Sequence, residues 1–187
     1  FSVGTKGKLS ANVVEFKSLD DLKNAKTGSL TGKIAFLNQP MDARFIDTFN
    51  AYSVAAAGRV YGPSIAAERG AVGFVMRSVA LRNEDFPHTG VMVNADGVDS
   101  IPSFALSTNA ANYLSSSLII EPKLELEMEA NCKLHSEVES YNIVGAIFGS
   151  KYPEKVIAVG GHLDSWDVGE GAHDDGTGIV ESIEVLR

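Results

Sequence analysis

The chain has 187 residues, of which 44% are hydrophobic and 21% charged, a composition typical of globular proteins that excludes disordered and collagen-like classes. Its 24 acidic and 16 basic side chains give a formal net charge of −8, and without a basic stripe such a surface argues against nucleic acid as a partner. No apolar run reaches the roughly 18 residues of a membrane span, and residues 1–10 do not have the pattern of a signal peptide.

The first two thirds of the chain predict a mixed α/β fold of short elements separated by turn signals. Runs of apolar and β-branched residues predict strands at residues 11–16, 33–38, 71–79, 102–106 and 123–134. In the last of these, Leu124, Leu126 and Met128 alternate with glutamates, which is the pattern of a sheet with one face in water. Ser18 is expected to cap a short helical turn at residues 19–23.

Three further helices are predicted in this region. Helical spacing over residues 43–57 rests on four large apolar side chains, Phe45, Ile46, Phe49 and Val54. A second helix is expected at residues 62–69, closed by Gly70, and a third opens at Thr108 or Asn109. Between the second and third helices, residues 81–100 predict a long irregular excursion, and such segments on compact domains are either functional or mobile.

The texture of the sequence changes near residue 138. Residues 141–148 and 156–159 are dense β-branched runs that predict two strands joined by a turn at 149–153, and helical spacing returns at residues 179–187. We therefore expect two domains, residues 1–138 and residues 139–187.

An acidic, glycine-rich window at residues 160–178 carries the chemistry. It contains five carboxylates and no lysine or arginine; the five are Asp164, Asp167, Glu170, Asp174 and Asp175. Such a concentration of like charge is unfavourable unless a cation or water offsets it. His162 and Asp164 stand two residues apart at the end of a predicted strand, so their side chains project to the same side. This arrangement suits a metal-ligating imidazole whose second nitrogen is held by a carboxylate.

Three other interpretations of the same window fail on chemistry. A phosphate-binding loop requires Gly-Lys-Ser/Thr, and the sequence here has Asp175-Gly176-Thr177. A dinucleotide fingerprint that begins at Gly169 would need a third glycine at the position of Asp174. A serine hydrolase of the nucleophile-elbow type is excluded because the chain has no Gly-x-Ser-x-Gly sequence.

The window from His162 to Gly178, the Pro87-His88-Thr89-Gly90 turn and residues 149–154 together resemble the two-zinc exopeptidases of metallopeptidase family twenty-eight. The resemblance implies a branch of that family in which a protease-associated domain is inserted into the catalytic domain. Residues 1–138 would then be the inserted, β-rich α/β domain. Residues 139–187 would be the N-terminal part of the catalytic domain, a partial α/β sheet.

The resemblance also implies roles for individual residues. His162 matches a zinc ligand, Asp174 the carboxylate that bridges two zinc ions, and Asp164 the catalytic residue that orients the ligand histidine. The peptide bond between Asp174 and Asp175 is expected to be cis. A complete site would hold two zinc ions, and a metal-bound hydroxide would attack the carbonyl of a dipeptide or short peptide. The family's other ligands and its general base match no residue of this chain, so we expect the chain to be inactive alone.

Several alternatives stay open at this point. His88 either contacts substrate or belongs to a turn that packs or forms a subunit contact, and Trp166 either walls the site or lies in the core. The family implies a secreted or periplasmic protein with peptide substrates, and a homodimer is possible. The competing hypothesis is a non-catalytic protease-associated module that serves in protein interactions.

Overall fold

The structure, a computed structural model, describes residues 2–133, 135–166 and 169–187. The chain divides into two compact units, Phe1–His135 and Ser136–Arg187, called unit 1 and unit 2 below. This division falls three residues before the boundary predicted at 138 (138 − 135 = 3). Each unit is described by itself.

Unit 1 is built on a five-stranded mixed sheet with the strand order β4-β3-β2-β1-β5. Its strands are β1 (Leu9–Phe16), β2 (Ile34–Leu37), β3 (Gly73–Arg77), β4 (Ser103–Leu106) and β5 (Glu125–Met128). The strands β1 to β4 pair in parallel, whereas β5 pairs antiparallel with β1. The mixed α/β class predicted from the sequence is thereby confirmed.

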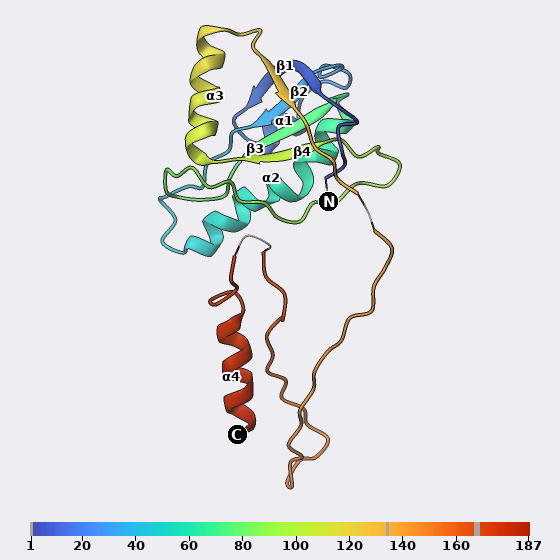
Figure 1. The fold of residues 1–187 in the computed structure, drawn as a ribbon. Coiled ribbons are helices and arrows are strands. Elements are labelled where there is room, and N and C mark those ends of the chain that lie inside the picture. The colour runs from blue at the N-terminus through green and yellow to red at the C-terminus, as the bar shows by residue number, and fades with distance from the viewer. Residues whose placement is uncertain (1, 134, 167–168) are drawn as a thin grey trace. The chain divides into compact units, whose positions relative to one another are not determined.

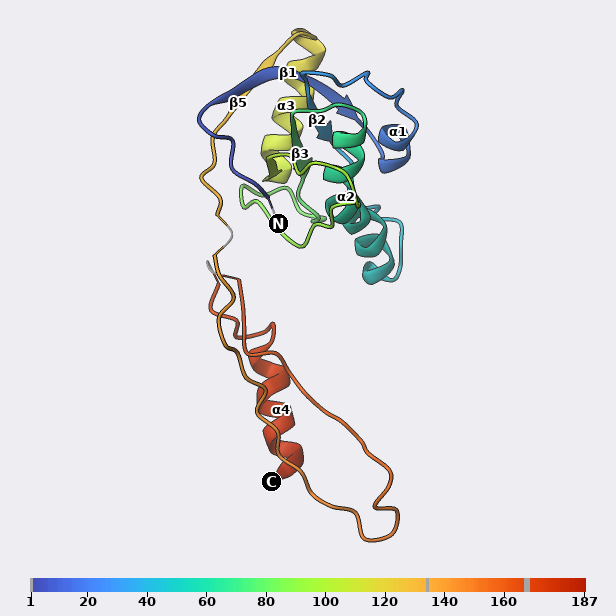
Figure 2. The same cartoon turned by 90° about the vertical axis from the view of Figure 1, so that its right-hand side faces the viewer.

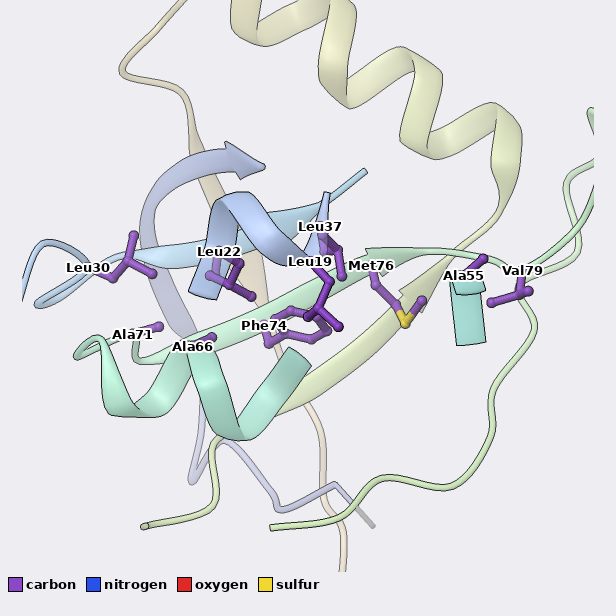
Figure 3. Packing of buried hydrophobic residues seen from close by; sticks show 11 residues of the cluster. Leu19, Leu22, Leu30, Leu37, Ala55, Ala66, Ala71, Phe74, Met76 and Val79 are labelled. Atoms are coloured by element: carbon purple, nitrogen blue, oxygen red, sulfur yellow. The ribbon is translucent and has the colours of Figure 1, made fainter. Parts of the chain in front are cut away.

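Helices cover both faces of this sheet, as Figures 1 and 2 show. These helices are α1 (Leu19–Lys23), α2 (Thr48–Glu68) and α3 (Thr108–Ile120). Side chains of α1 and α2 pack with Phe74 and Met76 in one buried cluster, and Figure 3 shows this cluster gathered around Phe74. Val75 points to the opposite face and packs against α3 in a second cluster. Because both faces are buried, the central strands β2 and β3 are apolar runs rather than alternating ones.

Helix α2 corrects the prediction of two helices at residues 43–57 and 62–69, because it is one continuous helix with Pro63 inside it. The predicted buried face was also wrong: Phe49 is 78% exposed and Val54 55% exposed. Small residues face the sheet instead. A Cβ atom on Gly58 or Gly62 would lie 2.6 Å from a side-chain carbon of Leu37 or Phe74, respectively. Glycine therefore allows the helix to approach the sheet closely, which a search for large apolar residues cannot detect.

At the C-terminal end of unit 1 the structure shortens a prediction. Strand β5 ends at Met128, whereas the sequence predicted a strand that continues to residue 134. Residue 134 itself lies outside the described residues. The predicted alternation is confirmed, since Met128 is buried while Glu125 and Glu127 are exposed. Helix α3 is capped by Ser107, whose hydroxyl accepts a hydrogen bond from the amide of Ala110.

The predicted excursion has no regular secondary structure between β3 and β4, but buried hydroxyl groups hold it in place. The hydroxyls of Ser78 and Thr108, residues with no exposed surface, accept hydrogen bonds from the amides of His88 and Glu84 at 2.7 and 2.8 Å. The hydroxyl of Ser64, which is 6% exposed, accepts one from the amide of Ala95 at 2.9 Å. The turn that carries His88 is therefore fixed to the sheet and to α3.

The described residues of unit 2 form one helix, α4 (Gly176–Leu186), close to the predicted 179–187. The strands predicted at residues 141–148 and 156–159 are not formed among the described residues of this unit, which corrects the prediction of a partial sheet. Their apolar side chains are exposed, for example Phe148 at 90% and Ile157 at 92%. The reason is that an isolated strand pair is marginal in water and needs further strands or a covering helix for stability.

None of the helices in the described parts of the chain has both the length and the apolar composition required to cross a membrane.

Candidate metal site

The start of helix α4 organises the acidic window. Asp175 is the N-cap, and its Oδ1 accepts a hydrogen bond from the amide of Gly178 at 3.1 Å. Gly171 has a φ of +65°, a conformation that favours glycine, and its carbonyl accepts a bond from the amide of Gly176 at 2.8 Å. The peptide bond between Asp174 and Asp175 is cis, as the resemblance implied. These contacts fix the backbone on either side of Asp174.

The structure brings together the three residues that the sequence singled out in this window. His162 Nε2 lies 2.8 Å from Asp174 Oδ1. On the other side of the ring, His162 Nδ1 lies 2.8 Å from the carbonyl oxygen of Asp164 and 3.2 Å from its Oδ1. The imidazole is therefore held from both sides, with Asp164 on one nitrogen and Asp174 on the other.

These neighbours also set the electrostatics of the ring. The carbonyl of Asp164 makes the largest contribution, followed by the carboxylate of Asp174, and together they raise the pKa of His162. Both contacts favour the protonated imidazole because each places negative charge against a ring N–H. A metal ion that binds at Nε2 has to replace this proton.

The donors fit a zinc site in kind and spacing. Imidazole nitrogen and carboxylate oxygen are both zinc ligands, and a tetrahedral ion bound at about 2.0 to 2.1 Å would hold them about 3.3 Å apart. The observed 2.8 Å requires a separation of only about 0.5 Å more. No group of three or more His, Cys, Asp or Glu side chains suited to a metal occurs in the part of the chain that the structure describes. The role of His162 and Asp174 as zinc ligands stays a prediction, and together they supply two donors of the kind that zinc takes.

The other predicted site residues make none of the contacts described above for His162, Asp164 and Asp174 in the parts of the chain that the structure describes. In unit 1, His88 Nε2 is 2.8 Å from Glu84 Oε1, and the side chain of His88 is 43% exposed. In unit 2, Trp166 is 59% exposed rather than buried in a core. Asp167, one of the five carboxylates of the window, lies outside the described residues. The substrate-contacting roles of His88 and Trp166 stay predictions.

Sequence reasoning missed the function of Asp175 in this arrangement. Its Oδ2 accepts a hydrogen bond from the backbone amide of His162 at 3.1 Å, in addition to the bond that Oδ1 makes with Gly178. An aspartate directly before a helix is a recognisable N-cap signal. The contact with His162 depends on how the chain folds back and leaves no local signal.

Comparisons with known proteins identify related sequences. Residues 142–187 match the model of Peptidase family M28. The chain is 38% identical over 186 residues to "Carboxypeptidase Q" of Mus musculus and to that of Homo sapiens, which covers 99% of this chain and 38% of each relative. A "Probable leucine aminopeptidase 2" of Aspergillus fumigatus gives a shorter match. It is 39% identical over 61 residues, which covers 31% of this chain and 12% of the relative.

A solved structure shows the same relationship. The crystal structure of a peptidase M28 precursor from Shewanella amazonensis SB2B is 38% identical, with a TM-score of 0.85, and the match covers 94% of this chain and 39% of that one. The chain thus spans a little over a third of the length of the carboxypeptidase Q relatives and of the Shewanella peptidase. The resemblance to peptidase family M28 predicted from the sequence motifs is confirmed, and within that family the chain is similar to carboxypeptidase Q.

Proposed function

We propose, on the premise that this chain is a carboxypeptidase Q-like member of peptidase family M28, that the protein is a zinc-dependent metallo-exopeptidase acting on dipeptides or short peptides. One observation carries the proposal. His162 Nε2 stands 2.8 Å from Asp174 Oδ1 while Asp164 holds the opposite nitrogen of the ring. The backbone carbonyl of Asp164, with its carboxylate at 3.2 Å, holds Nδ1 and leaves Nε2 directed at the Asp174 carboxylate, as expected for an imidazole that is oriented to bind a metal.

The family resemblance gives the roles, and the observed contacts are compatible with them. His162 and Asp174 would hold zinc, with Asp174 between two ions in a complete site, and Asp164 would keep Nε2 directed at the metal through its contacts with Nδ1. Bound zinc would supply a Lewis acid for the carbonyl and would lower the pKa of water. The family's remaining zinc ligands match no residue of this chain and would come from the rest of the whole protein. His88 and Trp166 are the side chains that we propose for contact with the peptide.

The division of the chain extends the proposal to its domains. We assign residues 1–138 to an inserted protease-associated domain and residues 139–187 to the catalytic domain. The exposed apolar side chains of unit 2, such as Ile143 at 86% and Val156 at 86%, support this assignment, because they would pair in a larger sheet. A secreted or periplasmic location and a homodimer belong to the same proposal.

Peptide hydrolysis by the whole protein tests the proposal. The protein that contains this segment would be loaded with zinc and incubated with a panel of dipeptides and short peptides. Amino-acid release would be measured by chromatography and metal content by elemental analysis. The H162A variant is expected to lose both zinc and activity. The H173A variant is the matched control, because the contact that His173 makes with Thr177 uses its backbone carbonyl, which accepts from the hydroxyl at 2.7 Å and is kept in alanine. A zinc-loaded protein that hydrolyses none of these peptides would overturn the proposal.

A second function, a non-catalytic interaction module, is favoured by the independence of unit 1. That unit has its own sheet and two buried clusters, whereas the described residues of unit 2 contain no group of three metal donors. The same assay separates the two functions. A whole protein that binds no zinc and hydrolyses no peptide would support the interaction module.

A further inference from the structure

We propose that Asp175 is a positioning residue for the metal site, whose carboxylate sets the separation of His162 and Asp174. This inference rests on the proposed function, because it concerns residues that would bind zinc. It assigns to Asp175 a task that the motif alone does not show. The argument begins with the two oxygens of its carboxylate.

Each oxygen of the Asp175 carboxylate accepts a hydrogen bond from a different segment of the chain. Oδ1 accepts from the amide of Gly178, in the first turn of α4, at 3.1 Å. Oδ2 accepts from the amide of His162, thirteen residues earlier in the chain, also at 3.1 Å. The backbone carbonyl of Asp175 accepts a third bond, from the amide of Ile179 at 3.1 Å. One residue therefore joins the segment before the acidic window to the helix after it.

Two glycines make room for this carboxylate. A Cβ atom on Gly161 would lie 2.9 Å from Asp175 Oδ2 and 2.7 Å from the backbone nitrogen of Ile179, so the segment before His162 could not come as close to α4. A Cβ atom on Gly178 would lie 2.8 Å from the same Oδ2 and would overlap the Oδ1 side of the carboxylate as well. Real Cβ atoms do not approach this closely, because such distances lie inside van der Waals contact. The close approach of the two segments depends on both glycines and on the carboxylate between them.

The consequence for the metal site is geometric. Asp174 is one peptide bond away from Asp175, and His162 is one hydrogen bond away from it. Both candidate zinc ligands are thus fixed relative to the same carboxylate, and the 2.8 Å between Nε2 and Oδ1 follows from that common support. Since both oxygens of Asp175 already accept backbone bonds, we assign it to holding the ligands in place rather than to binding the metal. Its negative charge also suits the N-terminus of α4.

A serine at this position separates the two tasks. Serine is a good N-cap and would keep the bond to Gly178, but its single short hydroxyl cannot also reach the amide of His162. In the whole protein, the D175S variant is therefore expected to keep hydrogen-exchange protection of the α4 amides and to lose protection of the His162 amide. Its zinc affinity, measured in competition with a chelator, is expected to fall about 10- to 100-fold, as for other residues that orient metal ligands.

Two further variants keep the test decisive. D175N has one side-chain acceptor for two backbone amides, so in either orientation an NH₂ group faces the amide of His162 or of Gly178, and the variant should weaken zinc binding even if D175S does not fold. E170Q removes one negative charge from the same window without touching this network and is expected to leave zinc affinity unchanged. If D175S or D175N binds zinc as tightly as wild type, the inference is wrong while the proposed function stands. If wild-type protein binds no zinc, the proposed function and this inference both fail.

Discussion

His162 and Asp174, twelve residues apart in the sequence, place Nε2 and Oδ1 at 2.8 Å from each other. The first residue comes from a segment without regular secondary structure, and the second directly precedes the cap of α4. A structural zinc ion normally takes four protein ligands and a catalytic one three. His162 and Asp174 are two donors, which is fewer than either kind of zinc site requires.

Zinc binding by the 187-residue chain should therefore be weak. We expect the ion to be lost on dialysis against a mild chelator, and the residual binding measured by titration calorimetry to disappear in H162A. The control is H135A, since His135 is exposed and lies outside the acidic window. Stoichiometric zinc that survives dialysis would show that further donors complete the site within this chain.

Replacing a glycine of α2 by alanine is expected to destabilise unit 1, although alanine has the higher helix propensity. Replacing a helical glycine by alanine in a solvent-exposed position stabilises a helix by about 1 kcal/mol. At Gly58 the added methyl group would overlap Leu37, whose side chain is 1% exposed and has no room to move. Overpacking of this kind costs about 1 to 3 kcal/mol, so we expect G58A to lower the free energy of unfolding of unit 1, measured by urea denaturation.

A compensating substitution tests the cause of that loss. The L37A variant alone should be destabilised by about 2 to 5 kcal/mol, because it leaves a cavity in the core. In the L37A background, however, the G58A change should be neutral or stabilising, since the overlapping atoms are gone. Equal losses from G58A in both backgrounds would mean that steric overlap with Leu37 is not the reason for the glycine.

The same helix shows where prediction from sequence ends. Strands β2 and β3 were predictable because buried parallel strands are continuous apolar runs, such as Ile34–Leu37. The packing face of α2 was not predictable, because its buried residues are small ones, mostly Ala and Gly, while large residues such as Phe49 face water. In unit 2, apolar runs predicted strands that have no partner strand among the described residues. An apolar pattern indicates which side chains of a segment can be buried. Which strand or helix buries them depends on the whole fold.

Part of the candidate site could likewise be predicted from the sequence and part could not. His162, Asp164 and Asp174 were predictable because their residue types and spacing are local properties of one window. The second hydrogen bond of Asp175 was not, because its partner is thirteen residues away and the contact depends on the fold of the chain between them.

The excursion between β3 and β4 should lose its order when its buried hydroxyl groups are removed. In T108V the methyl group replaces a hydroxyl that accepts from the amide of Glu84 and donates to the carbonyl of Arg82, at 2.8 and 2.9 Å. A buried amide left without a hydrogen-bond partner costs about 1 to 3 kcal/mol. The loop should therefore separate from α3, so that the amide of Glu84 can bond to water. We expect faster hydrogen exchange at Glu84 and His88.

A matched substitution on the same helix provides the control. The hydroxyl of Ser117 is exposed and donates only to the carbonyl of Tyr113 within α3. The S117A variant should therefore leave exchange at residues 84–88 as in wild type. Unchanged exchange in T108V would show that the excursion is held by other contacts.

Glu15 makes the stability of unit 1 depend on pH. Burial would by itself raise the pKa of this carboxyl group, but hydrogen bonds from Lys17, Asn38 and Ser115 together outweigh burial and lower the pKa below its ordinary value of 4.5. The side chain is 15% exposed, and Oε1 accepts from Asn38 Nδ2 at 2.6 Å. A carboxyl group whose pKa is lower in the folded state contributes stability above its unfolded value, and this contribution is lost as the pH falls through the folded value.

We therefore expect E15Q to lower the free energy of unfolding by about 1.5 kcal/mol at neutral pH, the size of a hydrogen bond to a charged group. The difference from wild type should shrink as the pH falls below 4.5, because wild-type Glu15 then becomes protonated as well. Urea denaturation over a series of pH values measures this. E125Q, at an exposed position on β5, controls for the general effect of removing one negative charge and should show no comparable loss at neutral pH. A difference between E15Q and wild type that stayed constant down to strongly acidic pH would contradict the assignment, because it would trace the loss to packing rather than to the ionised carboxylate.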